Sequence, residues 1–83
     1  MMTLNELDKA IQAMEVENIK AAKRQYLRLI ECLRASKGST HSSVRESAMR
    51  YARLAKMDIA KVRKDMLAAG VNADDVDGTI KWA

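Results

Sequence analysis

The sequence predicts an all-α protein, built as a long antiparallel two-helix hairpin followed by a short C-terminal helix. The chain has 83 residues, no proline and only three glycines, so few positions interrupt a helix. Apolar residues recur every three or four positions along two long stretches, as on one face of a helix. Residues with capping side chains stand at the start of each stretch, and a glycine follows each. Together these observations predict a single helical domain over residues 1–83.

The first helix is expected at about 4–36. Thr3 and Glu6 have the spacing of a capping box, in which the two side chains bind each other's backbone N–H groups. Gly38 is expected to adopt the left-handed conformation just after the helix, in a loop over 37–42. The expected core stripe of this helix consists of Leu4, Leu7, Ile11, Ile19, Ala22, Tyr26, Leu29 and Leu33.

A second helix is expected at about 44–69. Ser43 and Glu46 form another predicted capping box, and Gly70 follows the last periodic residue. Because the loop between the two long helices is short, they should lie antiparallel. The apolar positions are spaced nearly as in a coiled-coil heptad, and they are Val44, Ala48, Tyr51, Ala55, Ile59, Val62, Met66 and Ala69.

A helix-turn-helix division of this second helix is the alternative. Two residues argue against it: Lys56 stands where the turn usually holds glycine, and Asp65 stands where an apolar residue belongs. Asp58 is positioned to cap a helix after such a turn. Since the apolar periodicity runs through without interruption, we expect one continuous helix. The residues that partly match the motif are Ala52, Ala55, Met57, Ile59 and Val62.

The third helix is expected at about 73–82. Asn72 is placed as its N-cap, and the carboxylates that follow favour a first turn. Val71 and Val76 have the spacing of a hydrophobic staple. Trp82 has two interpretations: it folds back over the open end of the hairpin, or it stands exposed as an anchor for a partner.

The charge is concentrated in the middle of the chain. Residues 20–64 hold 13 lysines and arginines against three carboxylates, a net charge of +10, whereas residues 1–19 and 65–83 each carry a net charge of −3. Like charges stand three or four residues apart along both long helices, which disfavours the helices unless a partner supplies anions. Seven of the thirteen basic residues are arginine, which binds phosphate with two parallel hydrogen bonds. This pattern predicts contact with a polyanion.

We therefore expect a small nucleic-acid-binding accessory or regulatory protein, of the kind found on phages and plasmids. Duplex DNA is favoured over RNA. Tyr26 and Tyr51 fall on the core stripes, so the chain offers no aromatic platform for single strands. Two alternatives stay open: a protein-interaction module (adaptor or inhibitor) docked on an acidic protein surface without nucleic acid, and a basic surface with no partner. The expected phosphate-binding residues are Lys20, Lys23, Arg24, Arg28, Arg45, Arg50, Arg53, Lys56, Lys61, Arg63 and Lys64.

A homodimer is also expected. A chain of this length with few large apolar side chains builds a marginal core, and two hairpins paired as a four-helix bundle would bury what one leaves exposed. The acidic ends either shield the basic surface or bridge to the basic surface of a second subunit. Asn18, within the apolar stripe of the first helix, is either a partly exposed residue or a buried amide that pairs with its symmetry mate.

The sequence predicts no enzyme, no metal site and no cofactor. Cys32 and His41 are the only cysteine and histidine, too few for a zinc site. We interpret Cys32 as a small core residue and His41 as a solvated loop residue. A single cysteine forms no intrachain disulfide, and the first residues lack the apolar run of a signal peptide. We therefore expect a cytoplasmic protein without membrane contact.

Overall fold

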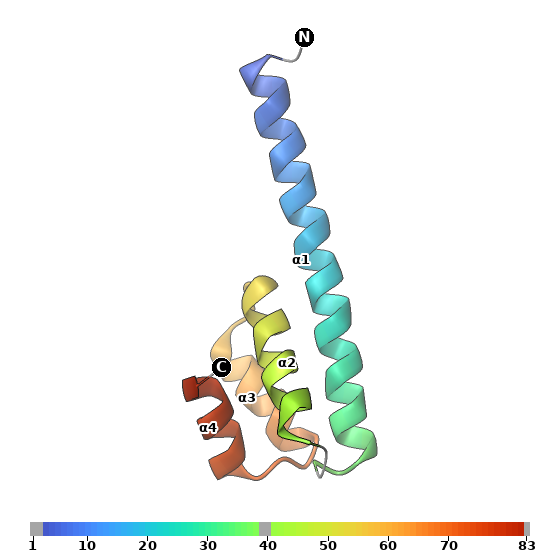
Figure 1. Ribbon diagram of the computed structural model, residues 1–83, viewed down its shortest axis with the longest axis vertical. Coiled ribbons are helices and arrows are strands. Elements are labelled where there is room, and N and C mark those ends of the chain that lie inside the picture. Colours follow the sequence, from blue (N-terminus) through green and yellow to red (C-terminus); the bar gives the residue numbers. More distant parts are fainter. Residues whose placement is uncertain (1–2, 39–40, 83) are drawn as a thin grey trace.

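The computed structural model describes residues 3–38 and 41–82, which fold into four α-helices (Figure 1). The all-α prediction is confirmed, and the described residues contain no strand. The long first helix packs against the second as in a hairpin, and the two shorter helices pack beside them. The helices are α1 (Leu4–Ala35), α2 (Ser42–Leu54), α3 (Ile59–Ala68) and α4 (Ala73–Trp82).

Helix α1 is closed at both ends by local hydrogen bonds. Thr3 Oγ1 accepts from the Glu6 N–H at 3.2 Å, and the Glu6 carboxylate accepts from the Thr3 N–H at 3.3 Å, which confirms the predicted capping box. At the other end Gly38 adopts the predicted left-handed conformation, with φ 79°, and Lys37 before it is left-handed as well, with φ 56°, so the left-handed stretch begins one residue earlier than predicted. The N–H groups of these two residues bind carbonyls of the last turn at 2.8 and 3.1 Å, as in a Schellman motif.

Gly38 and Gly70 lie against each other where two loops meet. Gly70 follows α3 with φ 98°, as predicted. A Cβ atom on Gly38 would clash with the carbonyl group of Gly70, so this close approach requires glycine. The contact joins the loop before α2 to the loop before α4.

The predicted continuous helix over 44–69 is wrong, because the chain turns between α2 and α3. Helix α2 ends in a Schellman motif in which Lys56 adopts φ 55°. The N–H groups of Lys56 and Met57 bind the carbonyls of Arg53 and Ala52 at 3.0 and 2.9 Å. These bonds satisfy the last carbonyls of α2 without continuing the helix.

Asp58 starts the next helix. Its side chain accepts from the Ala60 N–H at 3.0 Å and caps α3. The apolar periodicity continues across the turn because both helices direct their seam residues into one core: Ala48 from α2 and Val62 and Met66 from α3 are all fully buried. Periodicity alone therefore did not reveal the break.

The starts of α2 and α4 test two further predicted caps. Helix α2 begins at Ser42, and His41 is its N-cap, with Nδ1 accepting from the Ser43 N–H at 3.3 Å. The predicted capping box of Ser43 and Glu46 is therefore wrong, because Ser43 already lies inside the first turn. The prediction for α4 is confirmed, since Asn72 Oδ1 accepts from the N–H two residues later at 2.9 Å.

The core lies where the C-terminal half of α1 meets the other three helices. Cys32, predicted to belong to it, is exposed instead, because α2 and α3 cover only the stripe of α1 that contains Tyr26 and Leu33. The side chain of Trp82 lies outside the described residues. The largest fully buried side chains are Tyr26, Leu33, Met49, Met66, Val62 and Val76.

The N-terminal half of α1, residues 4–17, projects beyond the other helices as an arm (Figure 1). Leu4 is 81% exposed and Leu7 and Ile11 are each 45% exposed, so the prediction that they lie in the core is wrong for the single chain. The physical reason is length: α1 has 32 residues, about 48 Å, whereas α2 has 13, about 20 Å. Of the helices described, none is long and apolar enough to cross a membrane.

Candidate nucleic-acid interface

Helices α2 and α3 and the four residues between them form a helix-turn-helix unit. Ala52 of α2 is fully buried in the core. Met57 in the turn is half-buried and packs against the core, while Val62 is fully buried in α3. Two short helices joined by a tight turn are the arrangement in which DNA-binding proteins present the second helix to the major groove.

Lys56 occupies the turn position that usually holds glycine. A left-handed backbone costs an L-residue roughly 1–2 kcal/mol, and the paired Schellman bonds offset this cost. The side chain of Lys56 is exposed. The turn therefore forms without glycine and carries a positive charge at its tip.

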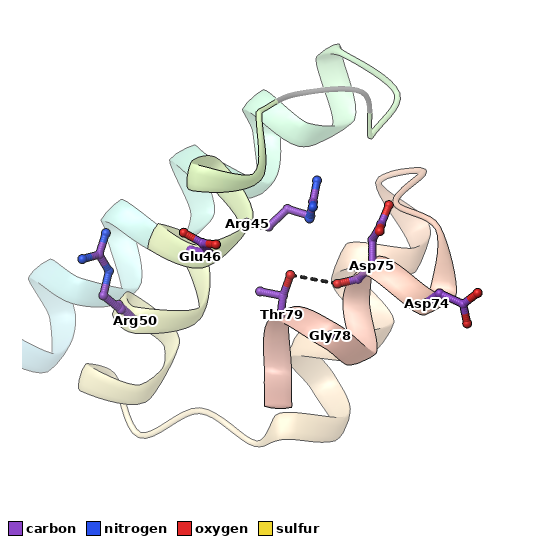
Figure 2. Close-up of a pocket in the computed structure, with 7 residues that line it drawn as sticks. All are labelled: Arg45, Glu46, Arg50, Asp74, Asp75, Gly78 and Thr79. Carbon is purple, nitrogen blue, oxygen red and sulfur yellow. Dashed lines mark hydrogen bonds between the residues drawn. The ribbon is translucent and has the colours of Figure 1, made fainter. Parts of the chain in front are cut away.

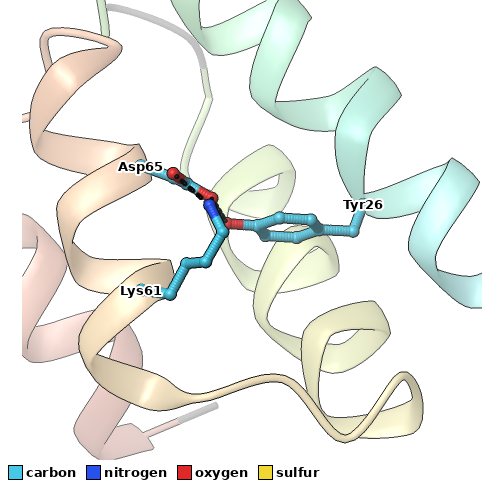
Figure 3. A network of polar contacts seen from close by, with 3 residues as sticks. All are labelled: Tyr26, Lys61 and Asp65. Atoms are coloured by element: carbon cyan, nitrogen blue, oxygen red, sulfur yellow. Dashed lines mark hydrogen bonds and ion pairs between the residues drawn. The ribbon is translucent and has the colours of Figure 1, made fainter.

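Asp65 occupies the position where the motif usually holds an apolar residue, and its carboxylate is fully partnered (Figure 3). The Tyr26 hydroxyl on α1 donates to Oδ2 at 2.7 Å, and Lys61 Nζ lies 3.1 and 3.2 Å from the two oxygens. Burial, together with the hydrogen bond to Asp65, raises the pKa of Tyr26 well above its ordinary range, so the phenol remains a donor. This network holds α3 against α1.

Helix α3 presents a polar face to solvent opposite its buried residues. Ile59, in the first turn, is an apolar exception and is 41% exposed. In DNA-binding helix-turn-helix proteins, residues at these positions contact bases and phosphates. Besides Ile59, the exposed residues from the first two turns are Ala60, Lys61, Arg63 and Lys64.

Several of the predicted phosphate-binding residues have partners within the chain. Arg63 Nε lies 2.9 Å from Asp77 Oδ1, and Lys61 pairs with Asp65 at 3.1 Å. Arg53 donates to a backbone carbonyl of α4 at 3.0 Å. Carboxylates from the acidic C-terminal block thus neutralise part of the charge on α3.

Five of the predicted residues remain exposed and form neither an ion pair nor a side-chain hydrogen bond with any residue that the structure describes. Lys64 lies on the outer face of α3 and Lys56 in the turn before it. Lys23 precedes Tyr26 by three residues, and the Tyr26–Asp65 hydrogen bond brings that part of α1 to α3. The five residues are Lys23, Arg24, Arg28, Lys56 and Lys64.

Arg45 and Arg50 lie elsewhere, in a pocket between α2 and α4 (Figure 2). The pocket is also lined by Glu46 from α2 and by Asp74 and Asp75 from α4. Two arginines among three carboxylates give this pocket no net attraction for a polyanion. The structure therefore does not gather the eleven predicted residues on one surface.

Sequence reasoning missed the bond between Tyr26 and Asp65. Two signals pointed to it: a tyrosine on a core stripe needs a partner for its hydroxyl, and a carboxylate on the inner face of a helix needs a donor. The sequence alone did not show that these two groups meet, because they lie 39 residues apart.

Searches with this chain against protein-family models, curated proteins and solved structures found no match.

Proposed function

We propose that this protein binds duplex DNA through its helix-turn-helix unit, as a small accessory or regulatory protein. In this proposal α3 enters the major groove, and Lys23, Lys56 and Lys64 contact the flanking phosphates. The observation that carries the proposal is the turn itself. Helix α2 stops at a left-handed Lys56 and α3 starts at the Asp58 cap, which leaves the outer face of α3 outside the core.

The two sequence features that argued against the motif each have a local structural account. The turn closes around Lys56 through Schellman bonds, and Asp65 receives donors from Tyr26 and Lys61. In the proposal Lys56 places a positive charge beside the first turn of α3. Lys61 lies near the duplex, and its charge is neutralised by Asp65. In this proposal the two positions hold residues that differ from those usual in the motif.

The first turn of α3 offers a candidate for base contact. Recognition helices use their N-terminal residues on base edges, and apolar side chains there contact the methyl group of thymine. Ile59 is an exposed apolar residue at this position. Arg63 is held by Asp77, so it must exchange a carboxylate for a phosphate or a base before it contributes.

The proposal is tested by the salt dependence of binding to a fluorescent duplex of about 25 base pairs. Each lysine that contacts a phosphate adds about 0.9 to the slope of log K against log salt. The double variant Lys56→Asn, Lys64→Gln removes two such charges, and asparagine tolerates the left-handed turn. We expect the slope to become shallower by about 2 and the affinity at low salt to fall.

A matched control removes the same charge elsewhere. Lys37 also has a left-handed backbone, with φ 56°, and Arg45 lies in the pocket beside α4. The double variant Lys37→Asn, Arg45→Gln should leave the slope unchanged. An equal effect of both double variants would contradict the assignment of the α3 surface. If the wild-type chain binds no duplex at low salt, the nucleic-acid proposal is overturned, and an acidic protein becomes the partner to test.

A further inference from the structure

We propose that the arm docks on a second copy of this chain in an antiparallel arrangement, with each arm seated in a groove at the base of the other arm. This inference concerns assembly and does not depend on nucleic-acid binding. It rests on three features of the described residues: an apolar seam along the arm, a groove that continues the seam, and the opposite charges of the arm and the α1 edge of the groove.

The arm carries an apolar seam with coiled-coil spacing. Its members alternate in steps of three and four residues, which aligns them on one face of a helix that crosses a neighbour at a shallow angle. Met14 is 64% exposed and Leu4 is 81% exposed. An isolated helix of this length is only marginally stable in water, so the arm needs a packing partner to stay helical. The seam comprises Leu4, Leu7, Ile11 and Met14, and continues through Asn18, Ala21 and Gln25.

The seam runs directly into a groove between α1 and α2. Asn18, Ala21 and Gln25 line the groove from α1, and Tyr51 and Leu54 line it from α2. Leu54 is 65% exposed, so its side chain has little cover from the described chain. One helix laid along this groove would cover Leu54 and the exposed seam together.

The α1 edge of the groove is basic. Arg24 and Arg28 each follow a groove residue of α1 by three positions. Positions three and four apart are neighbours on a helix surface. Both arginines are exposed, so a helix in the groove would lie beside positive charges.

The arm has the complementary charge, and this selects the orientation. Residues 1–19 carry one lysine against four carboxylates. In a parallel pair, two arms of net charge −3 would lie side by side. In an antiparallel pair each acidic arm lies along the basic groove of the other copy, where opposite charges attract. Charge therefore favours the antiparallel pair.

The seam spacing sets the register of this pair. With Met14 at the two-fold axis, Leu7 of one copy lies opposite Ala21 of the other, and Ile11 lies within one residue of Asn18. Leu4 then lies within one residue of the level of Gln25, at the far end of the groove. The exposed Asn18 is thereby covered by the partner, and the small Ala21 leaves room for a larger side chain.

Sedimentation analysis of the full chain tests the association. We expect a species of twice the 9.3 kDa chain mass at tens of micromolar. Ile11→Asp places a charge in the seam and should give a monomer with reduced helical circular dichroism. Gln12→Asp adds the same charge one residue later, outside the seam, and should leave the dimer intact. A monomeric wild-type chain, or equal effects of the two variants, would overturn the proposal.

Disulfide trapping tests the orientation. With Cys32→Ser as background, Leu7→Cys together with Ala21→Cys should form an intermolecular disulfide under mild oxidation, because the two positions face each other across the antiparallel pair. Leu7→Cys alone should stay reduced. A disulfide formed by Leu7→Cys alone would mean that the arms run parallel. Neither result depends on nucleic acid, so a failure here leaves the proposal for α3 untouched, and the reverse also holds.

Discussion

Tyr26 connects the long helix α1 to α3, the helix proposed to contact DNA. It is fully buried on α1, and its hydroxyl donates to Asp65 on α3 at 2.7 Å. Lys61 donates to the same carboxylate from the solvent side. A single buried phenol therefore fixes the position of α3 relative to Lys23 and holds Lys61 in an ion pair.

Removing this hydroxyl tests its contribution. Tyr26→Phe keeps the ring but loses a hydrogen bond to a charged acceptor, at a cost of roughly 1–2 kcal/mol. Lys61 still satisfies Asp65, which limits the cost. We expect urea denaturation at fixed protein concentration to show this loss. Tyr51→Phe is the control, because the Tyr51 hydroxyl forms no hydrogen bond with the described part of the chain, and it should change stability less.

Tyr26→Phe should also change how the stability of the protein depends on pH. Burial and the bond to Asp65 raise the pKa of Tyr26 above its ordinary value of 10.0, so the folded state keeps a proton that the unfolded state releases. The stabilisation is complete below pH 10 and declines as pH rises above it, by about 1.4 kcal/mol per pH unit. The wild-type chain should lose stability relative to Tyr26→Phe across this window. Parallel curves for the two proteins would contradict the bond.

At the scale of elements, the turn between α2 and α3 determines which helix faces stay exposed. A continuous helix would have given two long helices with a seam, whereas the turn gives a short α2, a separate α3 with a free outer face, and an arm of α1 without a cover. Both the proposed DNA contact and the proposed dimer follow from this one interruption.

A lysine-to-glycine substitution tests the turn, because it should change stability in opposite directions at a left-handed position and in a helix interior. At a left-handed position glycine removes the strain of an L-residue, so Lys56→Gly should stabilise the protein by about 1 kcal/mol. In a helix interior the same change destabilises by about 1 kcal/mol, and Lys64→Gly within α3 supplies that control. Thermal and urea denaturation measure both. A destabilising Lys56→Gly would mean that the helix runs through residue 56.

The elements that the sequence predicted well are those whose signals are local. The capping box of Thr3 and Glu6, the Asn72 cap and Gly70 all act within one turn of chain, and each is confirmed. The turn at Lys56 was mispredicted because lysine carries no signal for a left-handed backbone. The Asp58 cap was visible, but the apolar periodicity that continues on both sides of it outweighed a single residue.

At the scale of the whole molecule, the basic residues of the central block fall on separate surfaces. Lys64 lies on the outer face of α3 and Lys56 in the turn before it, whereas Arg24 and Arg28 each lie three positions from a groove residue of α1, and Arg45 and Arg50 line the pocket with carboxylates between α2 and α4. The sequence predicted the charge but not this division, because it depends on how the four helices pack. The proposed dimer contact and the proposed DNA contact therefore use different faces of the molecule.

The most direct measurement is an amide chemical-shift titration of the labelled protein with a duplex of about 25 base pairs at low salt. We expect saturable shifts concentrated at residues 55–64 and near Lys23, which reverse when salt is raised. The arm and the pocket between α2 and α4 should change little. Absence of shifts, or shifts centred on Arg45 and its pocket, would contradict the proposal that α3 and its turn form the DNA-binding surface.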